Sequence, residues 1–284
     1  MRIHTVGYHD GGNGVVNCRE LTMKFVERIL RVPTVRRWLW RRWYQWLVRR
    51  DARPDWTFMN YGYCAEEPLG LPEEREADRY CIQLYDFLAS ATALEGLEVL
   101  EVGSGRGGGA AWVHERHRPA LMMGVDYTPA NIEFCRARHT APGLDFVVGD
   151  AEALLFENDR FDALLNLESS HCYGSRARFY GEVVRVLRPG GCFLYADMFD
   201  AAETGEIRRL LAEAGLRVES EQDISNEVFE AMRCDDERKR RLIEERAPRW
   251  LRGLVRQFAG VDGSEVHNNL GSGAIRYLAF VLRN

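Results

Sequence analysis

The sequence predicts an α/β fold built on a doubly wound, mostly parallel β-sheet, and three observations lead to this prediction. Short apolar runs alternate with amphipathic segments through the middle of the chain, as in parallel strands joined by crossover helices. A glycine-rich turn follows the first of these runs. The chain also has 284 residues, 46% of them hydrophobic, and can therefore bury one sizeable core.

The expected elements of this fold follow one another from about residue 78. Buried strands are predicted over 97–102, 122–126, 144–148, 163–167 and 191–196, and a last strand over 274–283. Helices are predicted over 110–117, 129–139 and 202–214. Thr128 is suited to cap the second helix before Pro129, and Gly215 is a typical residue to end the third.

This order divides the chain into four segments. Residues 1–75 are expected to form a helical N-terminal lid that ends in a turn-rich, acidic stretch, and residues 76–224 the ligand-binding α/β core. Residues 225–270 are expected to form a small substrate cap of two helices interrupted near Pro248, and residues 271–284 the final strand of the core sheet. Both segments outside the core are candidates to cover a ligand site.

Composition excludes several classes of protein. The N-terminus has no apolar segment of a secretory signal, and no run of about 18 uncharged apolar residues occurs, so neither a leader nor a membrane span is expected. The seven cysteines are scattered without a C-x-x-C pair, which argues against a disulfide framework or a zinc site and favours the cytoplasm. A formal net charge of -5 argues against a nucleic-acid partner.

Positive charge is nevertheless concentrated near the N-terminus. Residues 1–50 hold eleven Lys and Arg against three Asp and Glu. Residues 36–50 contain six arginines and four of the seven tryptophans, with Trp and Leu on one helical face. This predicted amphipathic helix could pack against the core or a second subunit in a homo-oligomer, cover an apolar substrate, or rest on an anionic membrane as a peripheral contact.

The turn after the first strand has the spacing of a ligand-binding loop. It reads VGSGRGGG and satisfies G-x-G-x-x-G at Gly103, Gly105 and Gly108. Glycines are needed where the backbone turns sharply and a nucleotide-type ligand must approach without a Cβ in the way. The pattern alone is weak, because a purely structural turn between strand and helix can share it.

Acidic residues after three consecutive strands strengthen the case for a ligand. Asp126 ends the second strand, where a carboxylate can accept hydrogen bonds from a ribose, and Asp150 follows the third. Glu101 lies just before the glycine turn, where its charge would repel the pyrophosphate of a dinucleotide. The acidic edge therefore favours S-adenosylmethionine, which carries a sulfonium charge and no phosphate, over NAD.

With these blocks the chain resembles the class I S-adenosylmethionine-dependent methyltransferases, and within them mycobacterial phthiotriolone and phenolphthiotriolone dimycocerosate methyltransferases and natural-product O-methyltransferases. The matching blocks are LEVGSGRGGG (100–109), GVDYTPANI (124–132), DFVVGDAEALLFENDRFD (145–162), LNLESSHCY (165–173) and RVLRPGG (185–191). The resemblance implies a Rossmann-like methyltransferase core with seven strands, and it runs from about Tyr44 to the C-terminus.

The resemblance also implies which residues bind the cofactor. Gly103, Ser104 and Gly105 would contact its methionine part, Asp126 the ribose, and Asp150 with Ala151 the adenine. In FMNYGYC, Asn60, Tyr61 and Tyr63 look like the family's N-terminal motif that closes over the cofactor. The remaining residues expected in the cofactor site are Glu101, Tyr127, Glu152, Asn166 and Glu168.

A candidate general base follows the fourth strand. Methyl transfer to a hydroxyl needs an aligned nucleophile whose proton is removed as the bond forms. His171 lies at this strand end, and Asp197 ends the adjacent strand, where its carboxylate could orient and charge the imidazole. We therefore predict a His171/Asp197 pair as the base. A histidine there could instead simply shape the pocket.

No metal is predicted, because the positions after the fourth strand offer Asn166, Glu168 and His171 instead of a carboxylate set. Cys172 is interpreted as pocket wall, since sulfonium chemistry needs no covalent enzyme intermediate.

The expected activity is O-methylation of a lipid-like or polyketide-type specialised metabolite, an apolar small-molecule substrate, with S-adenosyl-L-homocysteine as the second product. C-methylation of an isoprenoid or sterol is the alternative, and it would want aromatic and acidic residues around the acceptor. A protein that binds the cofactor without methylating, as a cyclase or scaffold, is a further alternative.

Overall fold

The computed structural model describes residues 56–249 and 251–284, which all belong to one compact unit, Val48–Asn284. The predicted Trp- and Arg-rich helix over 36–50, and most of the expected N-terminal lid, lie outside the described residues. Residues 56–72 form no helix or strand.

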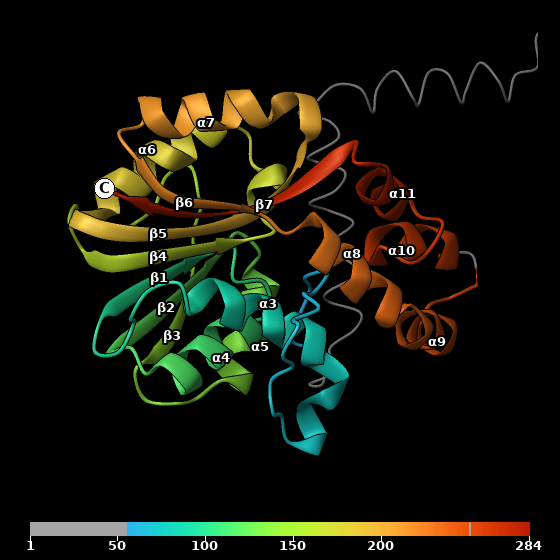
Figure 1. The fold of residues 1–284 in the computed structure, drawn as a ribbon. Coiled ribbons are helices and arrows are strands. Elements are labelled where there is room, and N and C mark those ends of the chain that lie inside the picture. The colour runs from blue at the N-terminus through green and yellow to red at the C-terminus, as the bar shows by residue number, and fades with distance from the viewer. Residues whose placement is uncertain (1–55, 250) are drawn as a thin grey trace, which may run out of the picture. The chain divides into compact units, whose positions relative to one another are not determined.

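The centre of the described unit is a seven-stranded sheet with the order β3-β2-β1-β4-β5-β7-β6 (Figure 1). The strands are β1 (Glu98–Val102), β2 (Leu121–Asp126), β3 (Leu144–Val148), β4 (Phe161–Leu167), β5 (Leu187–Asp200), β6 (Arg217–Asp223) and β7 (Ile275–Arg283). The first five strands are parallel, and β7 runs antiparallel between β5 and β6. The predicted doubly wound, mostly parallel fold is therefore confirmed.

Helices cover both faces of this sheet (Figure 1). One face carries α3 (Arg79–Ala89), preceded by the 3-10 turn η1 (Glu73–Asp78), with α4 (Gly108–His117) and α5 (Pro129–Arg138). The other face carries α6 (Arg176–Val186) and α7 (Thr204–Glu213), which follows the 3-10 turn η3 (Ala201–Glu203). Each face has its own buried apolar cluster, so the strands are enclosed on both sides and read as continuous apolar runs.

Three elements of the core were not predicted. Strand β6 has no apolar pattern: it is polar and mostly exposed because it forms the edge of the sheet, where its acidic residues pair with arginines such as Arg283. Helices α3 and α6 are amphipathic, a pattern that would have allowed their prediction. The six predicted strands all occur, with bounds shifted by a few residues at most ends.

The prediction of two helices between residues 225 and 270 is wrong, because the structure has four there. They are α8 (Ser225–Cys234), α9 (Asp236–Arg246), α10 (Arg252–Ala259) and α11 (Glu265–Ser272). Gly260 takes a left-handed conformation (φ 64°) after α10, and the Ser264 side chain accepts a hydrogen bond from the His267 amide at the start of α11. These signals end one helix and begin another without a proline.

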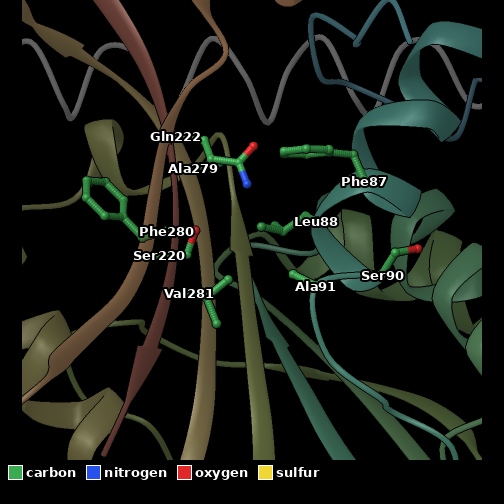
Figure 2. A pocket seen from close by; sticks show the side chains of 9 residues that line it. All are labelled: Phe87, Leu88, Ser90, Ala91, Ser220, Gln222, Ala279, Phe280 and Val281. Atoms are coloured by element: carbon green, nitrogen blue, oxygen red, sulfur yellow. The ribbon is translucent and has the colours of Figure 1, made fainter. Parts of the chain in front are cut away.

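A hollow of about 180 Å³ lies between α3 and the strands β6 and β7 (Figure 2). Phe87 and Leu88 face it from α3, while Ala279, Val281 and Gln222 face it from the strands. None of the residues that line it belongs to the predicted site.

Candidate active site

The site is assembled at the carboxyl edge of the parallel strands. Register pairs Val102 with Val125 at the ends of β1 and β2, and Leu167 with Ala196 near the end of β4 and in β5. The loops that follow these strands therefore meet at one edge, where open α/β sheets bind ligands. All the predicted site residues come from these strands and loops, except the closing motif with Asn60, Tyr61 and Tyr63.

The glycine turn needs its glycines for different reasons. Gly103 has φ 83°, and a Cβ there would lie 2.3 Å from Ser169 Oγ. Gly105 has φ 54°, but a Cβ there would make only an ordinary van der Waals contact with Met59 Sδ at 3.4 Å. The amides of Gly103 and Ser104 both donate to the Val125 carbonyl, at 2.8 and 2.9 Å. The turn is thus fixed by β2, and a side chain at Gly105 would not clash with it.

The start of α4 is closed by protein. The Gly108 amide donates to the Thr57 carbonyl at 3.2 Å, and a Cβ on Gly109 would lie 1.9 Å from the Tyr85 ring. These glycines therefore let α3 and the chain at residue 57 pack onto α4. Because Thr57 occupies the helix N-terminus, this end is poorly suited to a phosphate, in agreement with the preference for a cofactor without one.

Glu101 is almost completely buried below the turn, with 1% of its surface exposed. Its Oε1 accepts a hydrogen bond from the Tyr85 hydroxyl at 2.8 Å, whereas Oε2 is buried without a hydrogen-bond partner among the described residues. Burial, with the nearby charge of Asp126, raises the pKa of Glu101 to about 7. A cationic ligand group would favour the charged carboxylate here.

Asp126 shapes the loop after β2. Its Oδ2 accepts from the Gly105 amide at 3.0 Å, and its Oδ1 from the Thr128 amide at 2.7 Å and from Asn131 Nδ2 at 3.0 Å. Thr128 immediately precedes α5, as predicted, but its side chain forms no capping hydrogen bond; the Asn131 amide donates instead to the Thr128 carbonyl at 3.0 Å. Tyr127, next in the chain, keeps 45% of its surface exposed beside this loop.

The residues after β3 serve different purposes. Asp150 Oδ1 accepts from the Glu152 amide at 3.0 Å, and Ala151 between them is buried. The Glu152 side chain binds the chain after β4, with Oε1 accepting from the Gly174 amide and from the Ser175 amide at 3.1 Å. Glu152 therefore holds the loop that follows β4 close to the end of β3.

Asn166 is buried at the end of β4 under the glycine turn. Its Nδ2 lies 2.7 Å from the Val102 carbonyl, 2.7 Å from Ser169 Oγ and 2.9 Å from the Tyr173 hydroxyl. The amide thus ties β4 to β1 and holds the Ser169 side chain against Gly103. It supports the turn from below.

Glu168 joins three parts of the site. It has a left-handed backbone (φ 46°), and its two carboxylate oxygens accept from the Tyr61 amide at 2.9 and 3.1 Å. Oε1 also accepts from the Tyr277 hydroxyl of β7 at 2.9 Å. Burial raises the pKa of Glu168 to about 7, so the group is poised near neutral pH.

The expected closing motif divides between two surroundings. Tyr61 is held by Glu168, and its hydroxyl donates to the Phe258 carbonyl of α10 at 3.4 Å. Asn60 instead donates to the Cys81 carbonyl of α3 at 3.2 Å, and Tyr63 stacks on Phe87 with ring centroids 4.7 Å apart. Of the three, Tyr61 alone contacts another predicted site residue through a hydrogen bond described here.

His171 and Asp197 lie together as the strand order predicted. His171 Nδ1 is 2.7 Å from Asp197 Oδ1, and the His171 amide donates to Oδ2 at 3.1 Å. Asp197 is fully buried, whereas the His171 side chain keeps 32% of its surface exposed. Because an ionised carboxylate only accepts, Nδ1 carries the proton and Nε2 is left as the basic atom.

The charges of this pair support each other. Burial opposes a charged imidazole, but Cys172 and Asp197 outweigh it, and the pKa of His171 lies well above its usual range. Burial likewise opposes ionisation of Asp197, yet the charge of His171 and its hydrogen bonds lower the pKa of that carboxyl. The pair therefore keeps the imidazole charged to a higher pH than usual, and its neutral form is the one that can accept a proton at Nε2.

Both chain neighbours of His171, Ser170 and Cys172, interact with the His171/Asp197 pair. Ser170 donates to Asp197 Oδ2 at 2.6 Å, a contact that no sequence motif signals. Cys172, interpreted as pocket wall, is accessible to solvent beside the imidazole. The surrounding protein disfavours the thiolate, but the charge of His171 outweighs this and lowers the pKa of the thiol. Within residues 56–249 and 251–284, no group of three or more His, Cys, Asp or Glu is arranged to hold a metal.

The chain is similar to known methyl-transferring proteins. A family model described as a methyltransferase domain matches residues 100–195. The chain is 39% identical over 241 residues to a phthiotriol/phenolphthiotriol dimycocerosates methyltransferase of Mycobacterium leprae, covering 84% of this chain and 89% of that protein. It is 42% identical over 217 residues to a fatty-acid O-methyltransferase of Mycolicibacterium smegmatis, covering 76% and 79%.

The fold is shared with solved structures. A geranyl diphosphate C-methyltransferase from Streptomyces coelicolor A3(2), solved with S-adenosyl-L-homocysteine, aligns with a TM-score of 0.58 and 18% identity over 79% of this chain and 87% of that one. At this identity the likeness shows the fold alone. No helix in the described part of the chain has the length and apolar character to cross a membrane.

Proposed function

Because the chain belongs to the S-adenosylmethionine-dependent methyltransferases, we propose that it methylates a hydroxyl of a lipid-like or polyketide-type metabolite. The observation that carries the choice of a hydroxyl is the His171/Asp197 pair, with Nδ1 and Oδ1 2.7 Å apart and Nε2 left as a base. The names of the mycobacterial relatives, which refer to lipid and fatty-acid methylation, support an apolar acceptor. The scattered free cysteines support a cytoplasmic location.

The residues of the carboxyl edge fit the cofactor. Glu101 Oε2 and Ser104 Oγ are buried without hydrogen-bond partners among the described residues, and these unpaired polar atoms lie beside the glycine turn. We assign the methionine part to Gly103, Ser104, Gly105 and Glu101. We assign the ribose and adenine to Asp126, Tyr127, Asp150 and Ala151. Glu152, Asn166 and Glu168 then support the loops that carry these residues.

S-adenosylmethionine supplies a methyl group on a positively charged sulfur. With the cofactor bound at this edge, the acceptor oxygen would take that methyl as the carbon–sulfur bond breaks, and His171 would take the hydroxyl proton of the acceptor at Nε2. Asp197 keeps the imidazole in the tautomer with its proton on Nδ1 and stabilises the cation once it forms. The pair thus raises the nucleophilicity of the oxygen without a metal.

The segments around the edge are proposed to enclose the acceptor. Tyr61 connects Glu168 with the Phe258 carbonyl of α10, and Gly260 after that helix leaves room for the Tyr61 ring, since a Cβ there would lie 2.7 Å from it. This contact supports the view that the helices α8 to α11 form a cap over an apolar substrate. Exclusion of water there would strengthen the electrostatic interactions of His171.

C-methylation is the second candidate, and Glu168 is the observation that favours it. Its buried carboxylate lies against Tyr61 and Tyr277, an acidic and aromatic group that could stabilise a carbocation. The two candidates differ in which residue is essential. Loss of His171 would abolish O-methylation, whereas loss of Glu168 would abolish C-methylation.

The test is methyl transfer from radiolabelled S-adenosylmethionine to three probes of different chemistry. Hexadecan-2-ol offers an aliphatic hydroxyl, palmitic acid a carboxyl oxygen, and geranyl diphosphate an alkene carbon. We expect a labelled ether or ester from the oxygen probes, identified by mass spectrometry. Label on geranyl diphosphate alone would overturn the proposal in favour of C-methylation.

Membrane contact through residues 36–50 is a separate proposal, supported by the six arginines and four tryptophans in this stretch. Co-sedimentation with phosphatidylglycerol vesicles at low salt should exceed that with phosphatidylcholine vesicles. Replacement of Arg41 and Arg42 by glutamate should remove the difference. Equal, weak sedimentation with both vesicles would leave the helix with a packing role in the chain or in a homo-oligomer.

A further inference from the structure

Behind Asp197 lies a line of buried hydroxyl groups that the proposed reaction does not yet use. Tyr180 and Tyr195 have their hydroxyl oxygens 3.0 Å apart, and the Tyr195 hydroxyl is 2.5 Å from Ser170 Oγ. Ser170 Oγ is in turn 2.6 Å from Asp197 Oδ2. All four side chains are at most 1% exposed, so the line is shielded from water.

The direction of each bond follows from the supply of hydrogens. An ionised Asp197 only accepts, so Ser170 spends its single hydroxyl hydrogen on Oδ2. Ser170 must then accept from Tyr195, whose own hydrogen is thereby used. Tyr195 must accept from Tyr180. The three O–H dipoles all point toward the carboxylate, an alignment in which each bond polarises the next.

The remaining positions around the carboxylate are also filled. Oδ1 accepts from His171 Nδ1 at 2.7 Å and from the Met198 amide at 2.8 Å, and Oδ2 accepts from the His171 amide at 3.1 Å. With Ser170 this gives four donors for four lone-pair directions. The carboxylate is therefore fixed in orientation, and its charge is spread over several donors.

We propose that Ser170, Tyr195 and Tyr180 are positioning residues that moderate how strongly Asp197 holds a proton on His171. The proposal rests on the proposed function, in which His171 is the base. Donors to Asp197 matter most when the imidazole is neutral and the carboxylate lacks a cationic partner. They therefore stabilise the neutral imidazole, the form that can accept a proton from the acceptor.

Other groups act on the same imidazole and stay unchanged when the hydroxyl line is altered. The titratable and charged groups that face His171 or its neighbours, from the loop, the sheet and the chain above, are Tyr61, Glu168, Cys172, Arg176, Asp197 and Tyr277. Of these, Asp197 alone bonds to the line of hydroxyls. Substitutions in the line thus isolate its effect through this carboxylate.

The first experiment is titration of His171 by NMR in the full chain, with ¹³C-labelled histidine and assignment by a His171→Asn variant. We expect Ser170→Ala to raise the proton affinity of His171 by roughly threefold or more, because the carboxylate loses a charge-assisted bond. Tyr195→Phe should raise it less, and Tyr180→Phe least. An unchanged or lowered affinity in both Ser170→Ala and Tyr195→Phe would overturn the proposal.

A control separates this effect from lost stability. Ser264 is also buried, at 2% exposure, and its side chain caps α11. Ser264→Ala should lower the unfolding temperature without moving the titration of His171. An equal shift in this control would contradict the proposal. Should Ser170→Ala fail to fold, Tyr195→Phe, which keeps the aromatic ring, decides the question by itself.

The pH dependence of turnover distinguishes this proposal from the proposed function. With hexadecan-2-ol as acceptor, the acidic limb of kcat/KM should move to higher pH in Ser170→Ala, whereas a merely structural role would lower activity equally at every pH. Full turnover in His171→Ala, together with a shifted His171 titration in Ser170→Ala and Tyr195→Phe, would refute the base but support the coupling. An inactive His171→Ala, together with an unshifted His171 titration in those two variants, would support the base but refute the coupling.

Discussion

At the scale of single residues, burial and local partners together set the protonation of the site's carboxyl groups. Glu101 and Glu168 have pKa values raised to about 7 mainly by burial. Asp197 is equally buried, yet its pKa is lowered because His171 and several donors outweigh the loss of water. The pKa values of these carboxyl groups thus shift in opposite directions because the fold gives them different partners.

The base pair makes the first prediction. His171→Ala removes the proton acceptor, and Asp197→Asn favours the wrong imidazole tautomer, so each should lower kcat by about 10²–10⁴-fold. Calorimetry with S-adenosyl-L-homocysteine should show retained binding in both variants. Near-normal turnover in both would reject the pair as the base.

The second prediction concerns Cys172. Although burial opposes ionisation, the charge of His171 lowers the pKa of this thiol, while burial raises that of Cys64. Iodoacetamide should therefore alkylate Cys172 faster than Cys64 at pH 7, as measured by peptide mass spectrometry. His171→Ala should slow the reaction at Cys172 alone. Equal rates at the two cysteines would show that the imidazole does not activate the thiol.

Sequence reasoning could predict the pairing of His171 with Asp197, because parallel neighbouring strands bring their carboxyl ends to one edge. It could not predict the contact of Glu168 with the Tyr61 amide, which depends on the path of residues 56–64 and on a left-handed backbone. The line of hydroxyl groups could not be predicted either, since nothing in the sequence distinguishes Tyr180 and Tyr195 from ordinary core aromatic residues.

At the scale of elements, the glycine turn combines two functions. Gly103 is required by the Ser169 side chain that Asn166 holds beneath it, whereas a Cβ on Gly105 would make only an ordinary van der Waals contact. The same sequence motif thus contains a position that protects the fold and another that leaves room for a ligand. A pattern of glycines alone does not separate the two.

The third prediction follows from this difference. Gly103→Ala combines a left-handed backbone with a clash and should lower the free energy of unfolding by about 2–5 kcal/mol. Gly105→Ala should cost only about 1–2 kcal/mol for its left-handed conformation. It should nevertheless weaken binding of S-adenosyl-L-homocysteine. Urea unfolding and calorimetry measure the two effects, and unchanged affinity in Gly105→Ala would place the cofactor elsewhere.

The strands with strong apolar patterns were predictable, and the polar edge strand was not. The parallel strands are buried on both faces and stand out as apolar runs, whereas β6 is an exposed edge strand stabilised by pairing with β7. The four helices α8 to α11 depend on short capping signals such as Gly260 and Ser264. A periodicity search merges such short helices into longer ones.

At the scale of the whole molecule, the raised carboxyl pKa values link stability to pH. A carboxyl whose pKa rises on folding binds protons that the unfolded chain has released, so stability falls as pH rises from the unfolded pKa through the folded one. Glu101 and Glu168 cover the window from about 4.5 to about 7. His139, whose pKa burial lowers, acts in the opposite direction below its usual pKa.

The fourth prediction is that the ligand-free protein loses stability between pH 6 and pH 8. Each of the two carboxyls should contribute a loss on the order of 1 kcal/mol over this interval. Thermal unfolding at the two pH values measures the effect. Glu101→Gln and Glu168→Gln should each reduce the difference, and a steeper loss in either variant would contradict the assignment of the raised pKa.

The position of β7 has a consequence for how the protein is made. This strand follows the six other described strands in the chain, yet it lies inside the sheet, where it pairs with both β5 and the edge strand β6. During translation β6 therefore leaves the ribosome well before its pairing strand exists. That half of the sheet must wait for residues 275–283, and a nascent chain stalled before them would expose an unpaired strand to chaperones and proteases.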